Sequence, residues 1–189
     1  MTKNFLRRLL NRALHSLARA LPGGRSLRPA LHRMRGVKIS GDVWIGDDVY
    51  LDNEHPDCIE IHEHAVISLK SIILGHTKGR GRVIIERDAF IGPLVVVACT
   101  GNKEIRIGEG AVISAGAIIT SSVAAHTIMA SPRVTAVGRS MVPYWDTTYL
   151  EFMGGLEPIR PPGSSANAHT TPASPSPSTA PNPPRDMDK

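Results

Sequence analysis

Aliphatic residues recur at a step of six between residues 39 and 119. They fall into four sets of three anchors, and every anchor is Ile, Leu or Val. The sets are 39, 45 and 51; 61, 67 and 73; 85, 91 and 97; and 107, 113 and 119. An amphipathic helix repeats about every 3.6 residues and a half-buried strand about every two, so a step of six favours neither. The pattern predicts a left-handed parallel β-helix, an all-β fold in which three hexapeptide repeats form one triangular coil.

The residues between the sets lengthen the chain at one place only. The steps from each third anchor to the next first anchor are 10, 12 and 10 residues, so all the extra residues follow a third anchor. Triangular coils stacked on one another form a prism, and these extra residues should form loops along a single edge of it. The small or β-branched residue four places after each first anchor suits a tight corner, where a bulky side chain would clash. These residues are Val43, Ala65, Ala89 and Ala111.

Composition divides the chain into four regions. Residues 1–36 combine apolar positions three to four apart with many arginines, which predicts a basic amphipathic α-helix over residues 4–21, followed by a lead-in. Residues 37–139 are the β-helix. Residues 140–159 hold half of the Phe, Trp and Tyr side chains and should form an ordered extension. Residues 160–189 are rich in Pro and Ser and lack core-forming side chains, so we expect a disordered tail there.

The net charge of +5 is unevenly distributed. Residues 1–36 contain nine Lys and Arg and no Asp or Glu, which leaves a net charge of −4 on the rest of the chain. A mildly acidic body argues against a general nucleic-acid-binding surface. The basic helix over residues 4–21 could lie on an anionic membrane, or pack on the prism or on another subunit, and the sequence leaves these alternatives open.

Cysteine content and the lack of long apolar runs bear on location. Cys58 and Cys99 cannot form a disulfide framework, which favours a reducing compartment. No apolar run approaches the roughly 18 residues of a membrane span, and the start lacks the apolar core and cleavage site of a secretory signal. We expect a cytoplasmic protein; if the basic helix contacts a membrane, it would lie at the inner face. The Arg-rich, acid-free start is also typical of mitochondrial transit peptides, which remains a second interpretation.

Three segments carry a family resemblance. They are LRPALHRMRGVKI over residues 27–39, GEGAVISAGAIIT over residues 108–120, and TIMASPR over residues 127–133. These are similar to the lead-in, the penultimate coil and the closing segment of the hexapeptide-repeat acyltransferases, and among them the sugar O-acetyltransferases. The usual Gly before the Pro of the closing segment is replaced by Ser or Ala. The resemblance covers about residues 28 to 139. It implies transfer of an acetyl group from acetyl-CoA to a saccharide hydroxyl, with no metal ion.

His76 lies in the longest insertion, residues 75–82, at the place where the resembled enzymes carry their catalytic histidine. Attack of a hydroxyl on a thioester requires a base for the hydroxyl proton, and histidine titrates near working pH. The candidates for a residue that orients His76 are Asn53, Glu54 and Glu60. We assign the neighbouring loop of the first set to the acceptor, with Asn53, Glu54 and His55 as its substrate-binding residues.

The donor site is implied by the resemblance alone. Ala115 and Thr120 match positions that contact the pantetheine arm of acyl-CoA through the backbone and a hydroxyl. The family often has Lys after that Thr, but this chain has Ser121, so recognition of the CoA phosphates would fall to Arg133 or Arg139. The resembled enzymes bind acyl-CoA between two subunits of a trimer, which implies a homotrimer.

Two other functions remain open on the same fold. In a metal enzyme like the γ-class carbonic anhydrases, His55, His76 and Cys99 would supply the ligands, because all three follow third anchors. In a non-catalytic scaffold, the β-helix would serve as a binding surface. The irregular loops that carry histidines favour an enzyme over a scaffold.

Overall fold

A computed structural model provides the structure of the chain and describes residues 2–132, 134–143, 145 and 147–159. The chain divides into two compact units, residues 1–133 and 134–189. The expected tail, residues 160–189, lies outside the described residues.

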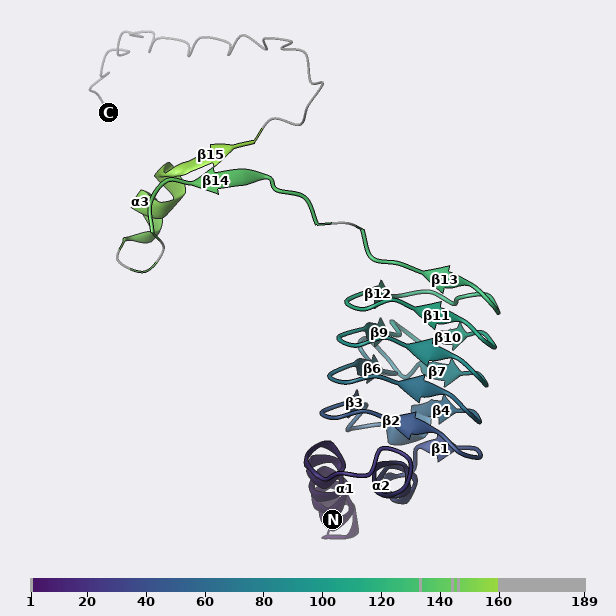
Figure 1. Cartoon of the computed structure of the whole chain (residues 1–189). Helices are drawn as coiled ribbons and strands as arrows, with labels where there is room; N and C mark the ends of the chain where they lie inside the picture. The colour runs from purple at the N-terminus through teal and green to yellow at the C-terminus, as the bar shows by residue number, and fades with distance from the viewer. Residues whose placement is uncertain (1, 133, 144, 146, 160–189) are drawn as a thin grey trace, which may run out of the picture. The chain divides into compact units, whose positions relative to one another are not determined.

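The first unit is a left-handed parallel β-helix, as the step of six predicts (Figure 1). Each coil contributes one short strand to each of three parallel sheets. Sheet A contains β1 (Lys38–Ile39), β4 (Ile59–Ile61), β7 (Arg82–Ile85) and β10 (Glu104–Ile107). Sheet B contains β2 (Trp44–Ile45), β5 (Val66–Ile67), β8 (Phe90–Ile91), β11 (Val112–Ile113) and β13 (Ile128–Met129). Sheet C contains β3 (Tyr50–Leu51), β6 (Ile72–Leu74), β9 (Val96–Ala98) and β12 (Ile118–Ile119).

The anchors form the core of the prism. Strand register places each anchor on its counterpart in the next coil, for example Ile61 on Ile85 and Ile85 on Ile107. Every anchor except Ile39 is buried, with an exposed fraction of 5 % or less. The small corner residues, such as Ala65 and Ala89, are fully buried as well. Burial of one such aliphatic side chain contributes roughly 1.5–3 kcal/mol, so the stacked anchors hold the coils together.

The corners of the prism are of two kinds. The turn between sheets B and C is tight and contains a left-handed residue in each coil, namely Asp48, Lys70, Leu94 and Gly116. The turn between sheets C and A carries the insertions, which include the short 3₁₀ helix η1 (Pro56–Cys58). Because the strands of sheet C stack in register, these loops lie along one edge, as the sequence predicts.

Two helices, α1 (Thr2–Ala20) and α2 (Leu27–Arg35), pack together at the base of the prism (Figure 1). The amphipathic helix α1 is predicted by the sequence, whereas α2 falls in the segment expected only as a lead-in. Leu14, Ala18 and Leu31 are buried between the helices. In the linker between them, the carbonyl of Gly24 accepts a hydrogen bond of 2.8 Å from the N–H of Ile45. The base thus satisfies part of the edge of the first coil, which would otherwise present unpaired backbone groups.

The outer face of α1 remains uncovered. Phe5, Leu6, Leu9 and Leu10 are each more than half exposed. The expected contact of residues 4–21 with a membrane or a neighbouring subunit therefore stays a prediction. Among the described residues, no helix combines the length and the apolar character that a membrane span requires.

The second unit contains β14 (Gly138–Ser140), α3 (Tyr149–Gly154) and β15 (Leu156–Pro158). The two strands pair antiparallel. Thr148 caps α3, since its hydroxyl accepts from the N–H of Glu151 while the Glu151 carboxylate accepts from the N–H of Thr148. Pairing within the β-helix ends at β13, so the expected boundary at residue 139 falls inside β14 of the second unit.

Candidate active site

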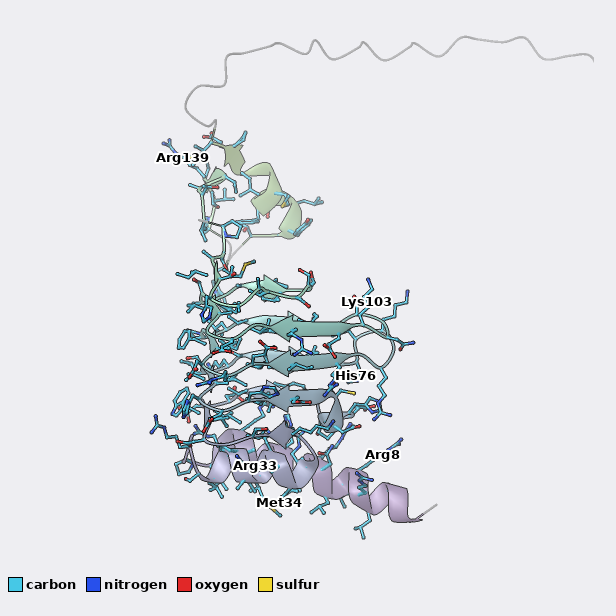
Figure 2. All side chains as sticks on the ribbon, turned by 90° about the vertical axis from the view of Figure 1, so that its right-hand side faces the viewer. Arg8, Arg33, Met34, His76, Lys103 and Arg139 are labelled. Atoms are coloured by element: carbon cyan, nitrogen blue, oxygen red, sulfur yellow. The ribbon has the colours of Figure 1, made fainter. Side chains whose placement is uncertain are left out.

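His76 and Asp52 meet at the loop-bearing edge of the prism. Asp52 directly follows β3, and His76 follows β6 in the next coil. The N–H of Asp52 donates to the carbonyl of Ile73 at 2.9 Å, which fixes the two coils side by side at this point. A short hydrogen bond joins His76 Nδ1 to Asp52 Oδ2. Figure 2 shows His76 at the edge from which the insertions project.

The carboxylate of Asp52 is fully buried and surrounded by N–H donors. Oδ1 accepts from the backbone N–H groups of Glu54 at 3.0 Å and His55 at 2.9 Å, and Oδ2 accepts from that of Gly75 at 3.0 Å. Burial alone would raise the pKa of Asp52. The donors from His55, His76 and Gly75 outweigh burial and hold this pKa below its ordinary value, so Asp52 is ionised at neutral pH.

Gly75 is required by the close approach of the two coils. A Cβ atom at residue 75 would lie 2.9 Å from the Cβ of Cys58. Only glycine lets the backbone N–H of residue 75 come within reach of the Asp52 carboxylate. The loop that presents His76 is therefore fixed by sterics as well as by hydrogen bonds.

The ionised partner determines which nitrogen of His76 carries the proton. A carboxylate only accepts hydrogen bonds, so Nδ1 carries a proton, and in the neutral imidazole the lone pair lies on Nε2. Nε2 has no hydrogen-bond partner among the described residues, and the side chain is 31 % exposed. This arrangement makes Nε2 an available base at the surface.

Asp52 replaces the three partners that the sequence suggested for His76. Asn53 Oδ1 instead lies 3.4 Å from Arg35 Nη2 and 3.4 Å from Asn11 Nδ2. Glu54 is exposed. Glu60 lies on the outer face of sheet A and binds His62 at 2.9 Å. One feature of the sequence could have identified Asp52 as this partner: it is the one charged residue directly after a third anchor. The other coils have Leu74, Ala98 and Thr120 at this position.

Arg35, at the end of α2, fixes the backbone of Asp52 from below. It is only 5 % exposed, and its guanidinium donates to the carbonyls of Asp52 at 2.9 Å and Leu51 at 3.3 Å. It also donates to Asn11 Oδ1 at 2.9 Å, which joins α1 to the network. Burial lowers the pKa of Arg35 to about 10, so the side chain stays protonated at neutral pH. The helical base therefore helps to position the carboxylate that binds His76.

His55, one of the expected acceptor residues, packs against His76. The two rings are edge to face, with centroids 5.1 Å apart. His55 and Glu54 both line two adjoining cavities of about 570 and 430 Å³, and Asn53 lines the smaller one. The structure thus brings the expected acceptor residues together beside His76.

Of the donor residues implied by the resemblance, Thr120 and Ala115 lie at different corners of one coil. Thr120 follows β12 at the loop-bearing corner, two coils beyond the coil of His76, and Ala115 lies at the corner between sheets B and C of the same coil. Both are exposed. Arg139 belongs to β14 in the second unit, and Arg133 lies outside the described residues.

Cys99 does not point its thiol toward the two histidines as a metal site would require. It is fully buried, and its Sγ donates to the carbonyl of Lys103 at 3.2 Å. Its own carbonyl accepts from the hydroxyl of Thr77 at 2.6 Å. Within the described part of the chain, no cluster of three or more His, Cys, Asp or Glu side chains could hold a metal ion.

Comparison with known proteins gave no match to this chain, either among protein-family models or among curated sequences.

Proposed function

We propose that this protein is an acyl-CoA-dependent O-acyltransferase that transfers an acetyl group from acetyl-CoA to a saccharide hydroxyl. The observation that supports this function is the pair of His76 and Asp52. A buried, ionised carboxylate holds Nδ1 of a partly exposed histidine and leaves Nε2 free at the edge of the prism. This is the arrangement that general-base catalysis requires.

The proposed reaction uses both nitrogens of His76. Nε2 takes the proton of the acceptor hydroxyl as its oxygen attacks the thioester carbonyl. The imidazolium that forms is stabilised by the negative charge of Asp52. The tetrahedral intermediate then collapses and expels the CoA thiolate, which takes the proton back from Nε2. Asp52 stays ionised throughout, because the N–H groups around it favour the charged form.

The outer faces of the three sheets support the homotrimer as part of this proposal. Sheet A presents ion pairs, such as Arg106 with Glu86 at 2.7 Å. Sheets B and C present apolar side chains instead. Ile118 is 71 % exposed, and Phe90 and Leu94 are also exposed. An apolar surface of this kind is typical of an interface between subunits.

The test of the proposal is the His76→Ala variant. Removal of a positioned base should lower turnover by roughly 10²–10⁴-fold. Affinity for acetyl-CoA, measured by calorimetry, and the melting temperature should barely change, because the side chain lies at the edge and outside the core. His55→Ala is the matched control, since it removes a neighbouring histidine that contacts the acceptor cavity. Its loss should appear mainly in the KM for the acceptor.

Three outcomes would contradict this proposal. A wild-type protein that does not bind acetyl-CoA cannot use it as donor. Near-normal turnover in His76→Ala would show that another group acts as the base. Equal and severe losses in both histidine variants, together with stoichiometric zinc in the purified protein, would favour the metal enzyme.

A further inference from the structure

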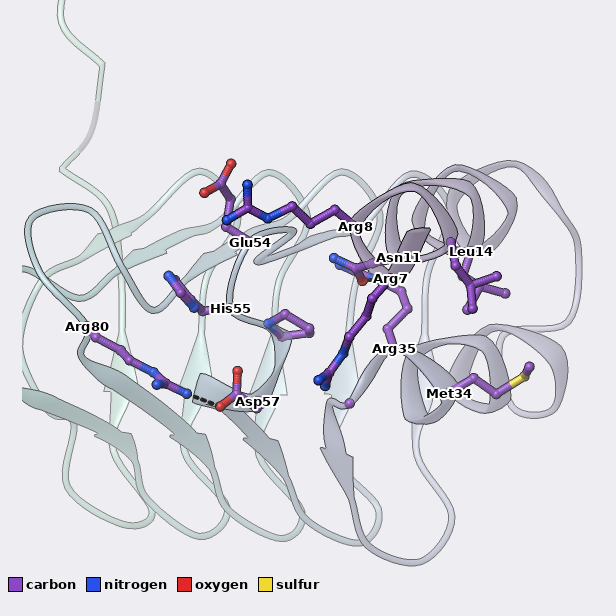
Figure 3. Close-up of a pocket in the computed structure, with 13 residues that line it drawn as sticks. Arg7, Arg8, Asn11, Leu14, Met34, Arg35, Glu54, His55, Asp57 and Arg80 are labelled. Atoms are coloured by element: carbon purple, nitrogen blue, oxygen red, sulfur yellow. Dashed lines mark hydrogen bonds and ion pairs between the residues drawn. The ribbon is translucent and has the colours of Figure 1, made fainter. Parts of the chain in front are cut away.

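A cavity of about 570 Å³ lies between α1, the end of α2 and the loop that follows β3 (Figure 3). Arg7 and Arg8 reach toward this loop from α1, and Arg80 reaches toward it from the insertion that also carries His76. Met34 and Leu14 contribute apolar surface. The cavity is therefore formed jointly by the helical base and by two loops of the prism.

The charges around this cavity do not balance. Its lining contains four arginines and two carboxylates, those of Glu54 and Asp57. Asp57 is neutralised by an ion pair with Arg80. Glu54 forms no ion pair among the described residues and is the other carboxylate of the lining, against three arginines. These are Arg7, Arg8 and Arg35.

None of the three remaining arginines has a carboxylate partner within the described part of the chain. Arg7 and Arg8 are exposed at the rim and have neither an ion pair nor a hydrogen bond there. Arg35 is buried, and its donors are used on neutral groups: carbonyls, the Asn11 and Asn53 side chains, and Nδ1 of His32. A guanidinium that is not neutralised attracts anions, and its planar donors match the oxygens of a phosphate or a carboxylate.

The cavity opens beside the proposed base. His55 lines it, and the ring of His55 lies 5.1 Å, centroid to centroid, from that of His76. A ligand held at Arg7 and Arg8 could therefore extend past His55 and bring a hydroxyl to His76. Thr120, the residue implied for the CoA arm, lies in the opposite direction along the prism, two coils beyond that of His76. Donor and acceptor would then approach His76 from opposite sides.

We infer that the acceptor is an anionic saccharide whose phosphate or carboxylate group is bound by Arg7 and Arg8 in this cavity. Arg35 contributes a fixed positive charge at its inner wall. This inference rests on the proposed acyltransferase function and defines the class of its acceptor. The anionic group anchors the sugar, and one hydroxyl next to it receives the acetyl group at His76.

The test measures binding without turnover, by calorimetry, with three matched sugars: glucose, glucose 6-phosphate and glucuronate. Wild-type protein should bind at least one of the anionic sugars about tenfold or more tightly than glucose, since charge-assisted hydrogen bonds to arginine are strong. The preference should disappear in Arg7→Gln/Arg8→Gln. The matched control is Arg25→Gln/Lys38→Gln, which removes two exposed positive charges that line neither cavity and should keep the preference. Tighter binding of glucose 6-phosphate would show that the site prefers a phosphate, and tighter binding of glucuronate that it prefers a carboxylate.

Two results would overturn the inference. One is the absence of any preference for the anionic sugars, or its persistence in Arg7→Gln/Arg8→Gln. The other is competition between coenzyme A and glucose 6-phosphate, with both losing affinity in this variant. That result would assign the cavity to the donor phosphates. Failure of the proposed function is seen separately, as a lack of acetyl-CoA binding. A protein that binds acetyl-CoA but shows no anion preference loses only the present inference.

Discussion

The coils of the prism and the helices at its base bury different kinds of side chain. The interior of the coils is almost wholly aliphatic, with stacked Ile, Val, Leu and Ala. The base buries His15, Arg28, His32 and Arg35 beside a small apolar cluster. A stack of coils needs only shape and apolar area, because its backbone groups pair with the coils above and below. A base that ends the stack must satisfy exposed backbone groups, and long polar side chains do so.

This difference shows where the candidate chemistry arises. Asp52 belongs to the first coil, yet Arg35 of the base binds its carbonyl and His76 of the second coil binds its carboxylate. The arginine-lined cavity also needs both regions. The site therefore lies at the junction of a repetitive region and an irregular one, and variants can be directed to the junction or to either side of it.

The largest effect is expected at the junction, for Asp52→Asn. An amide has a single acceptor oxygen and cannot accept from three backbone N–H groups and from His76 as well. His76 would lose the partner that keeps the proton on Nδ1, so turnover should fall by roughly 10²-fold or more. The melting temperature should fall too. Steady-state kinetics and thermal unfolding measure the two losses.

Asp48→Asn is the control for this variant. Asp48 is an aspartate of the same coil as Asp52; it pairs with Arg19 at the corner between sheets B and C, whereas His76 lies at the corner between sheets C and A. Its replacement should leave turnover unchanged. If Asp52→Asn kept wild-type turnover and lost only stability, the junction would be structural and His76 would need another partner.

The second prediction concerns the prism alone. Ile118→Glu places a charge on the outer face of sheet C, where the side chain is 71 % exposed in the single chain. In a trimer interface this charge would be desolvated and unpaired, and dissociation should become easier by roughly 10²-fold. Light scattering across a dilution series measures this. Lys38→Glu, on the outer face of sheet A, should leave the assembly intact. A wild-type protein that is monomeric throughout, or an unaffected Ile118→Glu trimer, would exclude this interface.

The smallest effect is expected in the base, and it should depend on pH. Burial, together with Arg35 and Arg19, lowers the pKa of His15 from 6.5 to about 4, and burial lowers that of His32 to about 3. Between pH 6.5 and about 4 the unfolded chain binds protons that the folded chain excludes. Folding is therefore favoured above pH 6.5, and stability decreases as the pH falls through this range.

His15→Phe should remove the His15 share of this acid sensitivity. Neither ring nitrogen of His15 has a hydrogen-bond partner in the described part of the chain, and phenylalanine can keep the edge-to-face contact with Tyr50. At pH 5 the variant should be more stable than wild type by about 1–2 kcal/mol, with little difference at pH 7.5. Urea unfolding at both pH values measures it. If the free energy of unfolding changed equally at both pH values, packing and not titration would account for the effect of the buried histidine on stability.

The sequence predicted the prism well because its rule is local and repeated. Each anchor is apolar for the same reason as the anchors above and below, so register and the loop-bearing edge follow from spacing alone. The position of His76 on that edge follows in the same way. The β-helical prism could therefore be predicted from one amino-acid sequence.

Helix α2 of the base and the partner of His76 were not predicted, for a physical reason. The segment that forms α2 buries mostly polar residues, namely Arg28, His32 and Arg35, so its apolar positions alone do not mark its buried face. Asp52 acts through backbone N–H groups of its own loop and of residue 75. Such contacts depend on the path of two loops, which the residue types in the sequence do not specify.

The spacing of the coils also bears on how this architecture can diverge in evolution. Paired residues of neighbouring coils are separated by 22 residues between β1 and β4, by 24 between β4 and β7, and by 22 again between β7 and β10. The two additional residues are absorbed in the insertion that carries His76, and the register of all three sheets is unchanged. Insertions or deletions at this edge can thus accumulate among descendants and reshape the loops around His76, while the pattern of the anchors stays under separate selection for folding.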